Sequence, residues 1–170
     1  MNFIHWPERY LPGTTDNFVS NEDIVKGLSA ADVWPVLINA SLWPAYNPQI
    51  SDVSAACKQL ALGMKFGFST FGFQVEAEVV EFVPPTPGQE GRMSFRGQIQ
   101  DDENGAIDLL QCWLIEELPG GRVRVLTQVS MIGKIAADMA RRRPNPMLNG
   151  DQMWLDGLIT SAKVVRAHAQ

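Results

Sequence analysis

Residues 64–79 read MKFGFSTFGFQVEAEV and contain two short runs in which apolar and polar or small residues alternate. A period of two is typical of a strand that buries one face, because successive side chains point to opposite sides of a sheet. Gly72 lies between the runs and marks a turn. The stretch predicts an antiparallel hairpin in which Glu76 and Glu78 face solvent.

The same period continues on both sides of this hairpin. Strong turn signals separate the later runs, Asp-Glu-Asn-Gly at 102–105 and Pro-Gly-Gly at 119–121. In the run after the hairpin, Arg92 and Arg96 alternate with apolar residues and are expected to face solvent. An antiparallel meander of about six to seven strands is therefore predicted. Its other strands are expected at 16–28, 92–99, 106–118 and 123–131.

Two short helices are predicted after the first strand. Ser29 and Asp32 have the spacing of a capping box, which opens a helix carrying Trp34 and Leu37. Pro35 lies inside that helix and should make it kinked or very short, because an interior proline removes a backbone hydrogen bond. A second short helix is expected over 41–46, before Asn47-Pro48.

A long amphipathic helix is predicted at the C-terminal end. Asn145-Pro146 resembles an N-cap followed by proline at the first helical position. A helix of about 22 residues would extend roughly 33 Å and could cover the apolar face of a curved sheet. The fold class is thus α+β. The expected apolar stripe consists of Met147, Asp151, Trp154, Leu158, Ala162 and Val165, with Leu155 and Ile159 beside it.

The first 15 residues are expected to form an N-terminal extension to a single domain that covers 16–170. Proline at positions 7 and 12 opposes a continuous helix there. We expect an irregular arm that packs Trp6 and Tyr10 on the domain.

Composition excludes several classes of function. The net charge of −5 is poorly suited to nucleic acid, and the basic run 141–143 is expected to be a solvated loop or helix end. His5 and His168 lie near the two ends, which argues against a histidine base or a histidine-ligated metal. Cys57 and Cys112 are expected to be free thiols. We expect no metal and no cofactor.

The chain is expected to be cytoplasmic. No signal peptide is recognisable, and no apolar run approaches the roughly 20 residues that a membrane-spanning helix needs. We therefore expect no membrane insertion, while a homo-oligomer is compatible with the sequence.

Large side chains concentrate on the predicted inner face, where they either fill a dry core or line a cavity. Sequence alone leaves these two alternatives about even. If Gln111 faces inward, a buried amide needs a partner, which could be a ligand or Thr127. Asp151 is notable because it lies on the apolar stripe of the last helix, although the helix dipole or a position at an open end also explains an acidic residue in the second turn. The candidate cavity residues are Trp43, Tyr46, Met64, Phe66, Phe68, Thr70, Phe95, Gln111, Trp113, Thr127, Met131, Asp151, Trp154 and Leu158.

The segment 29–50, SAADVWPVLINASLWPAYNPQI, resembles the opening of the START-like (SRPBCC) superfamily. Members commonly carry a Trp/Tyr-Pro-x-Trp-Asn-Pro segment. Here it reads WPAYNP at 43–48, with Tyr46 where tryptophan is usual. Trp113, the turn at 118–121 and the long last helix fit the same pattern. The resemblance extends over about 16–168. Within the superfamily, the sequence is most similar to the polyketide cyclase/dehydrase-like branch. It implies a helix-grip fold that encloses a hydrophobic cavity.

Three functions remain open at this point. The first is a carrier or sensor that binds a small hydrophobic or aromatic metabolite in the cavity between the sheet and the last helix. The second is a cyclase or dehydratase-like enzyme with unidentified catalytic residues, which would rely on positioning and one carboxylate or phenol. The third is a protein-interaction domain, which requires an exposed apolar patch.

Overall fold

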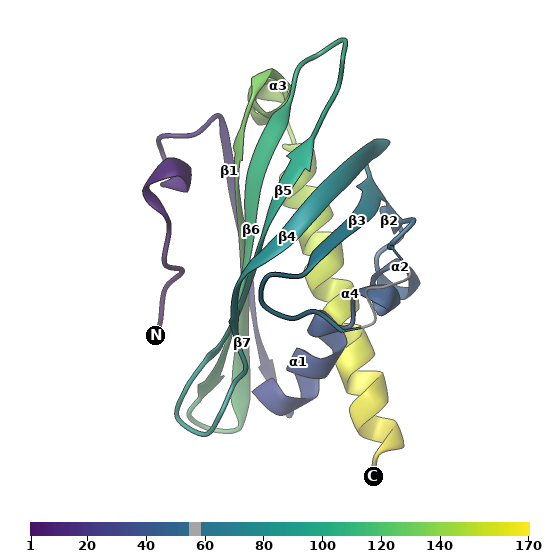
Figure 1. The fold of residues 1–170 in the computed structure, drawn as a ribbon. Coiled ribbons are helices and arrows are strands. Elements are labelled where there is room, and N and C mark those ends of the chain that lie inside the picture. The colour runs from purple at the N-terminus through teal and green to yellow at the C-terminus, as the bar shows by residue number, and fades with distance from the viewer. Residues whose placement is uncertain (55–58) are drawn as a thin grey trace.

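A seven-stranded antiparallel sheet forms the body of the computed structural model, which describes residues 1–54 and 59–170 (Figure 1). Its order is β1-β7-β6-β5-β4-β3-β2, so the strands from β3 to β7 form the predicted meander. Cys57 lies outside the described residues. The strands are β1 (Asn17–Lys26), β2 (Ile50–Ser51), β3 (Lys65–Thr70), β4 (Phe73–Val83), β5 (Gly91–Ile99), β6 (Ile107–Leu118) and β7 (Arg122–Ile132).

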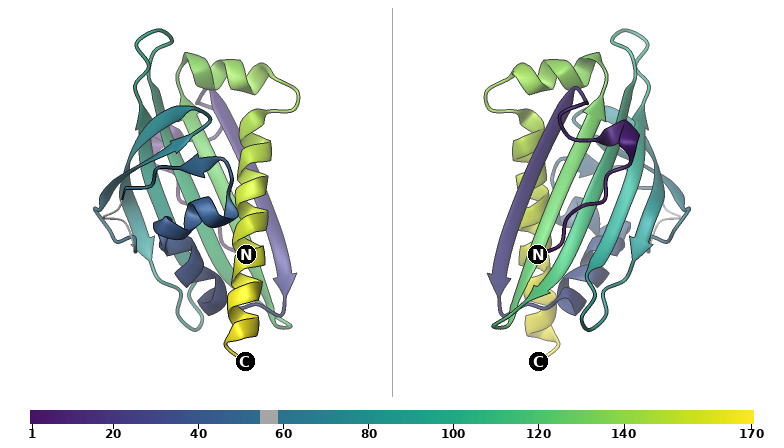
Figure 2. Two further views of the ribbon diagram at one scale, coloured as in Figure 1. Left: turned by 90° about the vertical axis from the view of Figure 1, so that its right-hand side faces the viewer. Right: turned by 90° about the vertical axis from the view of Figure 1, so that its left-hand side faces the viewer.

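The helices lie mainly on the concave side of this sheet, and α4 runs along it (Figure 2). This arrangement confirms the predicted helix-grip fold. Among the described residues, no helix is long and apolar enough to cross a membrane. The helices are η1 (Glu8–Tyr10), α1 (Ala30–Ile38), η2 (Ala40–Leu42), α2 (Trp43–Tyr46), α3 (Lys134–Arg141) and α4 (Pro146–His168).

Local sequence signals explain where α1 and α4 begin. The Ser29 hydroxyl accepts a hydrogen bond from the Asp32 backbone, and the Asp32 carboxylate accepts one from the Ser29 backbone, so the predicted capping box is confirmed. α1 has 9 residues and continues through Pro35 to Ile38, so Pro35 does not end it. At the start of α4, Asn145 Oδ1 accepts from the Met147 amide at 3.0 Å, and Pro146 is the first helical residue. Both caps satisfy backbone donors that a helix end leaves free.

Two elements and the position of Val165 depart from the sequence predictions, as does the burial of Arg92 described below. Neither β2 nor α3 was predicted, because β2 has two residues and α3 has no capping side chain at its start. α3 buries only Ala136 and Met139. Val165 was placed on the apolar stripe of α4 but is exposed, because the buried part of that stripe ends at Ala162.

Aromatic rings around Trp43 fill much of the space between sheet and helices. The Trp43 ring lies 4.9 Å from the Trp154 ring of α4, and 5.7 Å from both Phe66 and Phe68 of β3. Its Nε1 donates to the Leu37 carbonyl at 2.9 Å, so this buried indole has its polar atom satisfied. Trp43 thereby joins the short helices, β3 and α4 into one core.

The register of β6 places Gln111 on the inner face. Ile107, Leu109 and Trp113, which share its parity, belong to the inner core, whereas Leu110 and Cys112 belong to a second core on the outer face. The sequence pattern of β6 is ambiguous because both of its faces are buried, so the usual alternation is lost.

The N-terminal arm covers the outer core (Figure 2, right). Tyr10 is buried, its hydroxyl donates to Asp108 of β6 at 2.6 Å, and Trp6 packs beside it. The expectation that the arm packs its aromatic residues on the sheet is thus confirmed.

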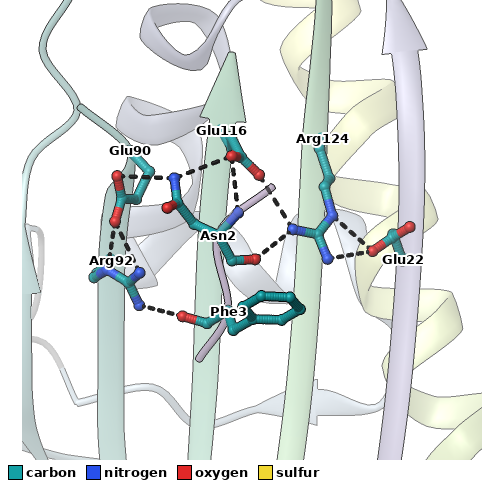
Figure 3. Close-up of polar contacts among 7 residues, drawn as sticks. All are labelled: Asn2, Phe3, Glu22, Glu90, Arg92, Glu116 and Arg124. Carbon is teal, nitrogen blue, oxygen red and sulfur yellow. Dashed lines mark hydrogen bonds and ion pairs between the residues drawn. The ribbon is translucent and has the colours of Figure 1, made fainter. Parts of the chain in front are cut away.

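Two buried arginines hold the start of the arm (Figure 3). Arg124 pairs with Glu22 and Glu116 and donates to the Asn2 carbonyl at 2.8 Å. Arg92 donates to the Phe3 carbonyl at 2.8 Å. Arg92 does point to the outer face, but the prediction that it faces solvent is wrong, because the arm covers it.

We expect Arg124→Ala to lower the free energy of unfolding by about 3 kcal/mol, because it leaves the buried Glu116 without its cation. Urea unfolding monitored by circular dichroism measures this loss. Arg96→Ala is the matched control, since Arg96 is 44% exposed in its pair with Asp108 and its loss should cost less than about 1 kcal/mol. Equal losses in the two variants would contradict a structural role for the arm cluster, which consists of Asn2, Phe3, Glu22, Glu90, Arg92, Glu116 and Arg124.

Candidate functional site

A small cavity of about 50 Å³ lies between the concave face of the sheet and the first turns of α4. Its wall is mostly aliphatic and aromatic. The lining residues are Asn47, Gln49, Ile50, Phe68, Thr70, Phe71, Phe73, Val75, Phe95, Ile99, Ile107, Leu109, Gln111, Met131, Met139, Met147, Gly150, Asp151 and Trp154.

The candidate residues from the sequence divide between this cavity and the packed core. The ones that line the cavity are Phe68, Thr70, Phe95, Gln111, Met131, Asp151 and Trp154. The others do not line it: Trp43, Tyr46, Met64, Phe66, Trp113, Thr127 and Leu158 pack in the core around it. Both alternatives from the sequence therefore hold in part, since one section of the inner face is filled and another is hollow.

Several lining residues were not named from the sequence. Val75, Ile99 and Leu109 follow from the strand alternation and could have been included. Phe71 lies in the β3–β4 turn, and Met139 lies on the unpredicted α3, so neither carried a usable signal. A cavity wall assembled from turns and helix ends depends on how distant segments meet.

A hydrogen-bonded chain of three buried side chains supplies the polar part of the wall. Gln111 Nε2 lies 2.7 Å from Thr127 Oγ1 and 3.1 Å from Asp151 Oδ2. The Thr127 hydroxyl donates its one proton to the Cys112 carbonyl at 3.1 Å, so it can only accept from Gln111. The amide nitrogen of Gln111, rather than its oxygen, therefore faces Asp151 and donates to it.

Asp151 is the single titratable residue in the cavity wall, as far as the described residues extend. It is 2% exposed and lies in the second turn of α4. Burial raises the pKa of Asp151 from 3.8 to about 7, because an apolar setting disfavours the charged form, while the hydrogen bond from Gln111 acts in the opposite direction. Near neutral pH this carboxyl group can thus hold or release a proton.

Phe71 closes one side of the cavity from an unusual backbone conformation. Its φ is 52°, in the left-handed region, and Gly72 beside it has φ 78°. A Cβ at Gly150 would lie 2.7 Å from the Phe71 ring and 2.9 Å from the Gln49 side chain, so glycine lets α4 approach this turn without displacing them. The aromatic ring thus rests directly on the helix backbone.

The wall at Phe71 is thin. Phe71, Phe73 and Met139 line both the cavity and a surface hollow of about 410 Å³ on its far side. A water position needs roughly 10–15 Å³ of such space, so the cavity with Phe71 in place holds about four water-sized groups. A larger molecule requires side chains of the wall to move, and at these three residues the wall borders the hollow.

Three buried polar atoms near the aromatic core have no hydrogen-bond partner within the described part of the chain. They are Tyr46 Oη, Trp113 Nε1 and Trp154 Nε1. Burial raises the pKa of the Tyr46 phenol well above its usual value. A contact between Tyr46 and Trp154 acts in the opposite direction on this pKa, and Trp154 also lines the cavity, one turn after Asp151.

Comparison with known proteins reveals close similarity to a solved structure. A hypothetical protein from Helicobacter pylori has 42% sequence identity, and the match covers 95% of this chain and 97% of that one at a TM-score of 0.90. No family model matches the sequence, and no curated protein does.

More distant structures share the fold. A START superfamily protein from Mycobacterium smegmatis matches 90% of this chain and 99% of its own, with 12% identity and a TM-score of 0.52. Truncated norcoclaurine synthase from Thalictrum flavum matches 88% of this chain and 92% of its own, with 10% identity and a TM-score of 0.59.

The titration of Asp151 predicts that wild-type protein loses stability as pH rises. The folded state holds a proton on Asp151 up to about pH 7, whereas an unfolded aspartate releases it near 3.8. The stabilisation is thus complete below about pH 4 and disappears as pH passes through 7. Relative to Asp151→Asn, the free energy of unfolding of wild-type protein should fall by roughly 2–3 kcal/mol between pH 5 and pH 8.

Urea unfolding of both proteins at half-unit pH intervals measures this difference. Glu76→Gln, which removes an exposed carboxylate from β4, should follow the wild-type curve. A constant difference between wild type and Asp151→Asn would show that Asp151 does not titrate in this range.

Proposed function

The chain belongs to one family with the Helicobacter pylori protein and has the fold of the START-like (SRPBCC) superfamily, and from this we propose that it binds a small, largely apolar molecule in the cavity beside Asp151. The molecule would lie between the sheet and α4, with one polar group directed at Asp151 and Gln111. The binding protein would act as a carrier or sensor.

The observation that carries this proposal is a buried carboxyl group in an otherwise apolar wall. Protein interiors rarely hold an ionisable group without a charged partner, because its desolvation is costly. Gln111 provides one hydrogen bond, and no cation lines the cavity within the described ranges. Apolar walls with a few convergent polar groups are what small-molecule sites commonly have.

A second candidate function is proton transfer by Asp151. A carboxyl group with a pKa of about 7 can act as acid and as base near neutral pH, which suits a cyclase or dehydratase-like reaction. Binding is preferred because the cavity wall offers no second titratable group to complete an acid–base pair, as far as the chain is described. Turnover of a ligand identified in the next experiment would reverse this preference.

Native mass spectrometry of purified protein, followed by denaturation and identification of small molecules, tests binding directly. We expect a co-purifying compound, present in less than full occupancy if it exchanges during purification. A clean mass without any compound, together with no thermal shift from a panel of aromatic and aliphatic compounds, would indicate a filled core and would favour the protein-interaction alternative.

Val75→Phe is expected to abolish ligand retention. Val75 is buried in the wall, and the larger side chain adds about four carbon atoms, enough to fill a cavity of about 50 Å³. Thermal denaturation should show that the variant still folds, and native mass spectrometry should show no bound compound. Ile24→Phe enlarges a residue that is 41% exposed on β1 and should retain the ligand.

A further inference from the structure

The only side chain of the cavity wall that can carry a charge, among the described residues, is Asp151, and its charge is negative. No arginine, lysine or histidine lines the cavity in the described part of the chain, and Asp151 is its one acidic group. An anionic ligand would bring like charges together in a medium of low dielectric, where repulsion is strong. The wall therefore disfavours carboxylates and phosphates near Asp151.

Asp151 also has unused capacity to accept hydrogen bonds. An ionised carboxylate has about four lone-pair positions, and Gln111 occupies one of them. The Gln111 amide cannot be reversed to offer its oxygen, because Thr127 needs a donor at that place. The protein thus presents an acceptor and leaves the donors to its ligand.

We propose that the ligand is a protonated amine with an apolar body, whose ammonium group pairs with the Asp151 carboxylate. This deepens the proposed function and rests on it. A primary ammonium supplies three donors and the missing positive charge. An alcohol supplies one donor and no charge, and so leaves the carboxylate largely uncompensated.

Aromatic rings around the carboxyl group favour the same class of ligand. The rings that line the cavity are Phe68, Phe73 and Phe95 from the sheet, Phe71 from the β3–β4 turn and Trp154 from α4. The face of an aromatic ring attracts a cation and also packs against an apolar body. The rings can therefore contact the carbon atoms adjacent to the ammonium group.

The titration of Asp151 is expected to control binding. The groups that face its cavity from the surrounding elements carry no charge: Gln111 from β6, Asn47 and Gln49 from the segment before β2, Thr70 from β3 and Met139 from α3. Beyond the thin wall, Asp138 and Arg142 line the surface hollow. Asp151 alone therefore changes charge inside the cavity near neutral pH.

Two matched sets of compounds test the proposal on the whole chain of 170 residues. The compact set is propylamine, propan-1-ol and propanoate, whose small size is close to the capacity of the cavity of about 50 Å³. The larger set is 2-phenylethylamine, 2-phenylethanol and phenylacetate, which requires side chains of the cavity wall to move. Titrations followed by protein NMR give the dissociation constants at pH 6 and pH 8.

In at least one set, the amine should bind at least tenfold more tightly than the alcohol and the carboxylate. Its affinity should rise about tenfold from pH 6 to pH 8, because the carboxylate form becomes dominant while the amine stays protonated. Asp151→Asn should remove both the preference and the pH dependence. Glu76→Gln removes the same charge from an exposed position and should change neither.

Two results would overturn the amine proposal while leaving a binding cavity intact: equal or tighter binding of the alcohol or carboxylate, and unchanged amine binding by Asp151→Asn. The wild-type pH dependence keeps the proposal testable if that variant fails to fold. If no compound of either set binds, the amine proposal falls, and the native mass measurement decides separately whether the cavity takes a ligand.

Discussion

The concave face of a strongly curved sheet is apolar and must be covered, and in this protein α4 covers it. Buried residues of α4 extend from Gly150 to Ala162 and pack against the inner core. α4 is straight while the sheet curves, so the two cannot stay in contact along their whole length. Trp43 and its neighbouring rings fill most of the difference, and the cavity is the part near Asp151 that they leave open.

Much of the fold could be predicted because its signals are local. Alternation in β3 and β4, the capping box at Ser29 and the Asn145-Pro146 cap each depend on a few neighbouring residues. The resemblance to START-like proteins supplied the connection between them, and the fold agrees with it. The polyketide cyclase/dehydrase-like branch stays a prediction. α3 could not be predicted, because it is short, has no capping side chain and is held mainly by contacts with strands.

The polar residues of the site could be predicted from the sequence, whereas the set of side chains that borders the cavity could not. Gln111 and Asp151 stood out as polar residues on apolar faces, and the structure brings them within hydrogen-bond distance although 40 positions separate them. Trp43 and Tyr46 carried the strongest motif, yet they pack in the core beside the cavity. A side chain's size and face can be read from periodicity, but whether its space is filled depends on the relative placement of sheet and helix to within an ångström or two.

The arm cluster has a practical consequence for anyone who produces this protein. The Asn2 backbone amide donates to Glu116, and the Asn2 carbonyl accepts from the buried Arg124, so the second residue is built into the outer surface of the sheet. An affinity tag or fluorescent fusion that alters these first residues would disturb that packing. The end of α4, where Val164 and Val165 are exposed, is the safer point of attachment for a tag, a label or a surface linker.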